Sequence, residues 1–207
     1  MKIFSRVLIA AAVAAAILPM ADANAQGVAH RGTIHRNARG GVTASRGTAA
    51  VGPNGGRVVH GRTVATNGAG GVVSARGTAF SGPNGTTGAR GAVNTVNANG
   101  TVTHKSGSVV RGPNGQEAAR AGKTTVNPDG SATHQSGFKA SGTRGSIQST
   151  GSSQRTSDGQ ASGARSTTAT GQNGNTYSGS TTWEKGEGVQ HTATCTDAGG
   201  NTIPCRK

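Results

Sequence analysis

The chain is poor in the residues that build a conventional hydrophobic core. It has 207 residues but only three Phe, one Tyr and one Trp, and neither Leu nor Met occurs after Met20. Full burial of a large apolar side chain contributes about 2 kcal/mol, whereas each ordered residue costs at least about 1 kcal/mol of backbone entropy. These shortages exclude an ordinary globular enzyme core. They leave a disordered chain, or a repeat that depends on backbone hydrogen bonds, narrow sheets or self-association.

Acidic residues are also scarce, with seven Asp and Glu against 21 Lys and Arg. The carboxylates are scattered along the chain, so no pair is placed for general acid and base catalysis. His104 and His134 occur in the same THxSG context 30 residues apart, which we interpret as repeat copying rather than as metal ligands. We therefore expect no catalytic residues, no metal and no cofactor, and a protein that is not an enzyme.

The first residues have the pattern of a secretory signal peptide. Residues 2–6 carry positive charge, residues 7–18 are apolar, and residues 23–25 (Ala-Asn-Ala) form an A-x-A cleavage motif. The apolar run is too short to span a bilayer, and no second apolar stretch follows it. We expect residues 1–25 to be removed. The mature chain should then be secreted or periplasmic, with attachment to the cell surface as a further option and without a membrane span.

Cys195 and Cys205 are the only two cysteines of the chain. An exported chain enters an oxidising compartment, in which two cysteines can pair. They flank Gly199 and Gly200, and a hairpin turn there would set them opposite each other within the reach of a disulfide. The sequence therefore predicts a Cys195–Cys205 disulfide in a C-terminal hairpin over residues 189–207.

The chain repeats. GPNG occurs at residues 52–55, 82–85 and 112–115, and related turns that end in glycine lie midway between these copies, so that the unit has 15 residues. Pro presets φ, Asn or Asp suits the next position and Gly supplies a positive φ, which together describe a type I turn with a G1 bulge. The intervening segments are rich in Thr, Val and Ser and are typical of strands. Most have a glycine near the middle, which in a strand marks a kink, a bulge or a close backbone approach.

These features predict an all-β fold in which the strand-turn repeats form an extended antiparallel β-meander over residues 37–188, after a flexible N-terminal lead-in at 26–36. A β-solenoid of stacked coils and a largely disordered low-complexity chain stay open as alternatives. The strand-turn repeat, the leader and the Gly/Ser/Thr/Asn composition resemble those of bacterial secreted β-repeat proteins. That resemblance implies a role at the cell surface or outside the cell.

Several basic residues keep a constant place in the repeat, at the centre of a strand. If the residue before each loop pairs with the residue after it, even-numbered residues from 40 to 145 share one face of the sheet. Directly opposed like charges repel each other by about 0.2 to 1 kcal/mol, so such a row is either well solvated or meets an anionic partner. The arginines that this register gathers into one stripe are Arg46, Arg62, Arg76, Arg90 and Arg120.

The sequence thus predicts a non-enzymatic, exported β-repeat protein that binds or scaffolds at the cell surface or outside the cell. The basic stripe predicts affinity for polyanions such as acidic polysaccharide, lipopolysaccharide or DNA. The alternative is a self-assembling matrix or amyloid-like structural subunit, because strands rich in Thr and Val with open edges can add further chains.

Overall fold

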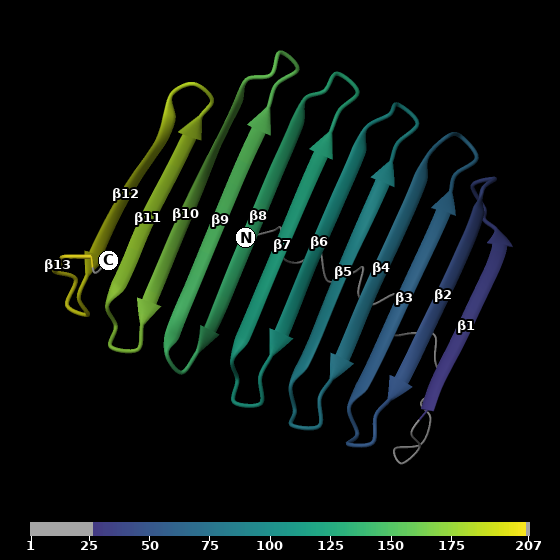
Figure 1. Cartoon of the computed structure of the whole chain (residues 1–207), viewed down its shortest axis with the longest axis horizontal. Helices are drawn as coiled ribbons and strands as arrows, with labels where there is room; N and C mark the ends of the chain where they lie inside the picture. Colours follow the sequence, from purple (N-terminus) through teal and green to yellow (C-terminus); the bar gives the residue numbers. More distant parts are fainter. Residues whose placement is uncertain (1–26, 206–207) are drawn as a thin grey trace. The chain divides into compact units, whose positions relative to one another are not determined.

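The computed structural model describes residues 27–205, and over this range the chain forms β-strands and turns without a helix. Each strand lies antiparallel to the strand that precedes it in its sheet (Figure 1). The all-β antiparallel meander predicted from the repeat is therefore confirmed. Within residues 27–205 there is no helix that could cross a membrane. The predicted signal peptide lies outside the described residues.

The chain separates into two compact units, the first ending at Pro113 and the second beginning at Asn114. The described part of unit 1 is a six-stranded meander in which every strand pairs with its neighbour in the chain. Its strands are β1 (Gly27–Arg36), β2 (Val42–Val51), β3 (Arg57–Thr66), β4 (Val72–Ser81), β5 (Thr87–Val96) and β6 (Val102–Arg111).

Unit 2 has the same neighbour-to-neighbour connectivity over seven strands in its described part. These are β7 (Glu117–Val126), β8 (Ala132–Gly142), β9 (Gly145–Arg155), β10 (Ala161–Gly171), β11 (Thr176–Glu184), β12 (Gly188–Thr196) and β13 (Thr202–Ile203).

The residues expected to be a flexible lead-in form strand β1. Gly27–Arg36 pairs along its whole length with β2, from Gly27 opposite Val51 to Arg36 opposite Val42. The turn that follows lacks the GPNG pattern, yet Asn37 performs the same task. Its backbone nitrogen donates to the carbonyl oxygen of Gly41 at 2.9 Å, and its side-chain oxygen accepts from the nitrogens of Arg39 and Gly41. The sheet of unit 1 therefore starts one strand earlier than predicted.

The NPDG turn shows how the turns close. Gly130 donates its backbone N–H to the carbonyl oxygen of Asn127 at 3.0 Å, and Asn127 donates to that of Ser131 at 2.9 Å. Gly130 has a φ of +83°, and every described residue with a positive φ is a glycine. The backbone thus adopts the type I turn with an added glycine bulge that the sequence predicts.

The register follows the predicted rule at the turns of unit 1, so its even-numbered residues share one face. The turn between β8 and β9 departs from it. Gly142 pairs with Gly145 across the two-residue connection Thr143-Arg144, one residue fewer than expected. A one-residue shift exchanges the two faces of a strand. Even-numbered residues of β7 and β8 therefore share a face with odd-numbered residues of β9 to β12.

Each unit is a single layer with little burial. Among the described residues only Ala92 and Ser149 are buried non-glycine side chains, and no large side chain is fully buried. One large ring covers a glycine: Phe80 pairs with Gly88, and a Cβ added at that glycine would overlap the ring. Cross-strand pairs of this kind, together with the backbone ladder, replace the missing core.

Strand β13 closes the C-terminal edge, and the predicted disulfide is present. Cys195 in β12 and Cys205 are bonded, with their Cα atoms 5.3 Å apart. Changing both cysteines to Ser should destabilise this hairpin by about 2 to 3 kcal/mol in the chain-entropy model, which faster amide exchange in β13 would report. If both thiols of the unreduced, denatured wild-type chain react with an alkylating reagent, the disulfide is refuted.

Candidate functional site

Three arginines lie side by side in the middle of unit 1. Arg46 pairs directly with Arg62, and Arg62 pairs directly with Arg76, on the adjacent strands β2, β3 and β4. All three side chains are exposed. We call the even-numbered face of β1 to β6 the arginine face. Its central line of cross-strand partners, the arginine row, consists of Gly32, Arg46, Arg62, Arg76, Ala92 and Ser106.

Arg90 lies on the same face, two residues along β5 from Ala92 of this row. It pairs with Thr78 while Arg76 pairs with Ala92, which makes Arg76 and Arg90 diagonal neighbours as the register predicts. The line that contains Arg90 also carries two histidines, each hydrogen-bonded to the threonine opposite. The distance from Nδ1 to Oγ1 is 3.0 Å in both pairs, which are His30 with Thr48 and His60 with Thr78.

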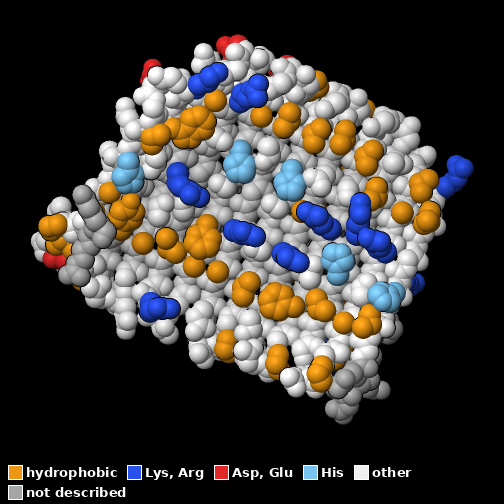
Figure 2. All heavy atoms as spheres, in the orientation of Figure 1, with side chains coloured by type: hydrophobic (Ala, Val, Ile, Leu, Met, Phe, Trp, Pro, Cys, Tyr) orange, Lys and Arg blue, Asp and Glu red, His pale blue; other side chains and the backbone are white. Residues whose placement is uncertain are grey.

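Apolar side chains border this polar centre on both sides. Figure 2 shows basic and histidine side chains along the middle of the face, with hydrophobic side chains on either side of them. At one end of the strands the cross-strand line is Val28, Ala50, Val58, Phe80, Gly88 and Val110. At the other end it is Arg36, Val42, Thr66, Val72, Val96 and Val102. Phe80 therefore lies apart from the arginine row.

The described part of unit 1 contains no carboxylate that could serve these arginines as a counter-ion. Between residues 27 and 113 the sequence contains ten Lys and Arg and not a single Asp or Glu. Arg46, Arg62 and Arg76 therefore have no carboxylate among residues 27–113 with which to pair, so solvent ions or a bound anion can compensate their charge. The sequence alone shows this separation of charge. The repeat of turns and strands does not reveal it.

Several carboxylates of unit 2, in contrast, are already engaged. Glu117 lies 3.1 Å from the Lys139 ammonium. In the turns, the hydroxyl of Ser131 donates to Asp129 and lowers the pKa of that carboxyl. The pKa of Asp197 is likewise lowered, first by the side chain of Asn201. These acidic groups stabilise their own hairpins.

The fifth predicted arginine, Arg120, belongs to unit 2. It lies in β7 opposite Phe138 of β8, with its side chain exposed. The structure thus brings four of the five predicted residues together on one face of unit 1. Because Arg120 belongs to unit 2, the arginine face of unit 1 does not include it.

The opposite face of unit 1 is bare along the centre of β2 to β6, and Arg31 of β1 lies opposite Gly47 at the end of this line. A line of glycines lies directly behind the arginine row. Each of these glycines is either next to an arginine in the sequence or at the equivalent centre of its strand. The glycines, opposed strand by strand, are Gly47, Gly61, Gly77, Gly91 and Gly107. Arg57, at the start of β3, and Lys105, in the outer strand β6, also lie on this face.

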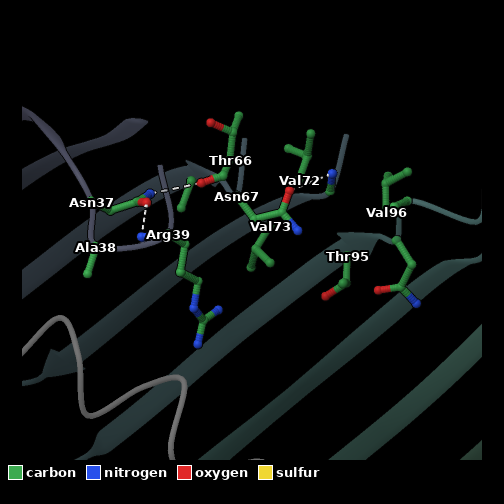
Figure 3. A pocket seen from close by; sticks show the side chains of 13 residues that line it. Asn37, Ala38, Arg39, Thr66, Asn67, Val72, Val73, Thr95 and Val96 are labelled. Carbon is green, nitrogen blue, oxygen red and sulfur yellow. Dashed lines mark hydrogen bonds between the residues drawn. The ribbon is translucent and has the colours of Figure 1, made fainter. Parts of the chain in front are cut away.

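One end of unit 1 has an open hollow between neighbouring turns (Figure 3). The Asn37 amide nitrogen donates to the carbonyl oxygen of Thr66 at 2.8 Å and joins the first turn to the end of β3. Arg39 is the sole charged side chain in the lining, which otherwise consists of small, amide and valine side chains. The hollow has no acid and base pair for catalysis.

Within residues 27–205, no three His, Cys, Asp or Glu side chains come close enough to hold a metal ion. The arrangement can present several neighbouring guanidinium groups to a larger anion. Comparison of the chain with protein-family models, with curated proteins and with solved structures finds no match.

Proposed function

We propose that this is an exported, non-enzymatic β-repeat protein that binds or scaffolds anionic polymers at the cell surface or outside the cell. The arginine face of unit 1 is the binding surface. The observation that carries the proposal is the direct opposition of Arg46, Arg62 and Arg76 in a segment without any carboxylate. Each such pair costs about 0.2 to 1 kcal/mol in the free sheet, and a bound polyanion removes this repulsion.

The geometry favours an extended ligand that runs across the strands. Adjacent strands are about 4.8 Å apart, so the three directly opposed arginines offer a regular series of charges. Guanidinium groups bind phosphate, carboxylate or sulfate groups through paired hydrogen bonds. Acidic polysaccharide, lipopolysaccharide and DNA all carry such groups in series. Because Phe80 lies outside the arginine row, stacking on bases should contribute little and binding should be independent of base sequence.

The test is a titration of the purified protein with duplex DNA and with an acidic polysaccharide at 50 to 200 mM salt, followed by fluorescence anisotropy. We expect tight binding at low salt that weakens steeply as salt rises, since every neutralised anionic group releases counterions. A neutral polysaccharide of equal length should not bind. Failure of both polyanions to bind at 50 mM salt, or equal binding of the neutral polymer, would refute the proposal.

A self-assembling matrix subunit is the second candidate function. It is favoured by apolar side chains that stay exposed on the outer strands, with Val28 63%, Ile34 79% and Val189 72% accessible. Open-ended assembly would produce fibres with spacings near 4.7 and 10 Å that seed fresh protein. Polyanion binding does not require such fibres, which separates the two functions.

A further inference from the structure

Strand β1 has an unpaired outer edge in the part of the chain that the structure describes. Its ten residues are all exposed, and β2 is the strand that borders it. Asn37 donates its N–H to Gly41. Because hydrogen-bonded and non-bonded residues alternate along an antiparallel strand, odd-numbered residues of β1 bond to β2. The even-numbered residues therefore direct their N–H and C=O groups outward, and such a row is a template for another strand.

The edge at the end of unit 2 is obstructed by comparison. Strand β13 pairs with Cys195 and Thr196 of β12. The Cys195–Cys205 disulfide holds the following residues against this edge, and Pro204 has no N–H to donate. A full-length strand cannot lie along β12 without displacing β13. Head-to-tail addition of copies is therefore disfavoured, whereas addition at β1 is not.

We propose that two copies of this chain pair through their β1 strands, antiparallel, about a two-fold axis at Gly32. A two-fold axis perpendicular to the sheet keeps each residue on its own face, so the numbers of opposed residues must add to an even sum. Centring on Gly32 sets Val28 opposite Arg36, His30 opposite Ile34 and Arg31 opposite Thr33. Centring one residue earlier would set Arg31 against Arg31 of the second copy, a like-charge pair.

The same axis joins the two arginine faces. Gly32 belongs to the arginine row, since it pairs with Arg46. In the dimer the row would pass from Arg76, Arg62 and Arg46 through the two Gly32 residues into the same series of the second copy. A two-fold contact uses the same surface on both copies and closes after two. The dimer does not depend on polyanion binding, although it doubles the length of the charged row.

The test is cysteine cross-linking at the axis. At Gly32 an added Cβ meets no atom nearer than the Ser45 carbonyl oxygen at 3.7 Å, so Gly32→Cys should fold. Directly opposed, hydrogen-bonded residues have Cα atoms about 5.5 Å apart, within the range of about 4.4 to 6.8 Å that a disulfide spans. Thr33→Cys is the control, because its counterpart in the second copy is two residues away along the strand, beyond about 7 Å. The native cysteines are already bonded.

In a thiol–disulfide buffer we expect at least tenfold more covalent dimer from Gly32→Cys than from Thr33→Cys. The yield should rise with salt, since salt screens repulsion between two basic copies, whereas polyanion binding weakens with salt. Gly32→Pro, in a protein with no other substitution, should abolish the dimer measured by sedimentation. The circular dichroism spectrum should stay unchanged, because the substitution deletes only an outward N–H.

Equal cross-linking at both positions, or no covalent dimer together with a monomeric wild-type protein, would overturn the dimer. Strongest cross-linking from Arg31→Cys would overturn the register, and fibres in place of dimers would overturn the closed contact. Each of these results is read without a polyanion and leaves the proposed binding function to its own test.

Discussion

Replacing Arg62, Arg76 and Arg90 together by Gln should largely remove the salt dependence of polyanion binding. Each lost contact to duplex DNA lowers the slope of log K against log salt by about 0.9, so three contacts lower it by about 2.7. Between 50 and 200 mM salt, wild-type affinity should then fall about 40-fold more than that of the variant. Anisotropy titrations at four or more salt concentrations measure both slopes.

The matched control changes Arg57, Lys105 and Arg111 to Gln. These residues lie on the opposite face of unit 1, and the substitution removes the same formal charge from the same unit. If binding depends on the arginine face, the control should retain most of the wild-type slope. Equal losses in the two triple variants would show that bulk charge alone attracts the polymer, and the proposed site would then be wrong.

Gly145→Ala should destabilise unit 2 more than Gly130→Ala does. Gly145 has a φ of +124°, a conformation that an L side chain rarely adopts and that costs about 1 to 3 kcal/mol. A Cβ at this position would also overlap the carbonyl oxygen of Thr170 on the neighbouring strand β10. Forcing β9 and β10 apart costs a further 1 to 3 kcal/mol or so. We expect a total loss of about 3 to 5 kcal/mol, measured by urea unfolding.

Gly130→Ala separates these two causes. Gly130 also has a positive φ, +83°, but nothing lies within 4 Å of an added Cβ. Its replacement should cost only the strain of the left-handed conformation, about 1 to 2 kcal/mol. Similar losses of unfolding free energy in the two variants would mean that the β8–β9 turn moves to make room. The close approach of Gly145 to Thr170 would then contribute nothing to the loss of unfolding free energy.

The fold class could be predicted because local chemistry and topology agree in this chain. Pro, Asn and Gly repeat at positions that only a tight turn uses, as at residues 82–85, and the short loops leave antiparallel neighbours as the simplest pairing. The Arg46–Arg62–Arg76 alignment followed from the same turns, because turn geometry sets register. The C-terminal disulfide followed from the symmetry of Cys195 and Cys205 about their turn.

Three features could not be predicted from the repeat. Strand β1 was missed because the predicted meander was started at the first turn of the repeat, residues 37–40, and the segment before that turn was taken as a lead-in. The shortened β8–β9 connection was missed because Gly145 keeps the glycine spacing while the turn loses a residue. The central glycines were expected to mark a kink, a bulge or a close backbone approach, and their alignment was not foreseen: in unit 1 they pair with one another in line, as Gly61 does with Gly77. A pattern within one strand does not reveal what lies opposite it.

The even register of unit 1 determines how such a chain can change its length. Equivalent positions 15 residues apart differ in parity and lie on opposite faces, as Arg46 and Gly61 do, whereas positions 30 apart, such as Arg46 and Arg76, lie on the same face. Duplication of a 30-residue hairpin would therefore lengthen the charged row and the glycine row together. Duplication of one 15-residue unit would move the arginines to the glycine face, and the glycines to the arginine face, in every strand that follows. The hairpin, and not the single strand, is thus the unit whose duplication extends this surface.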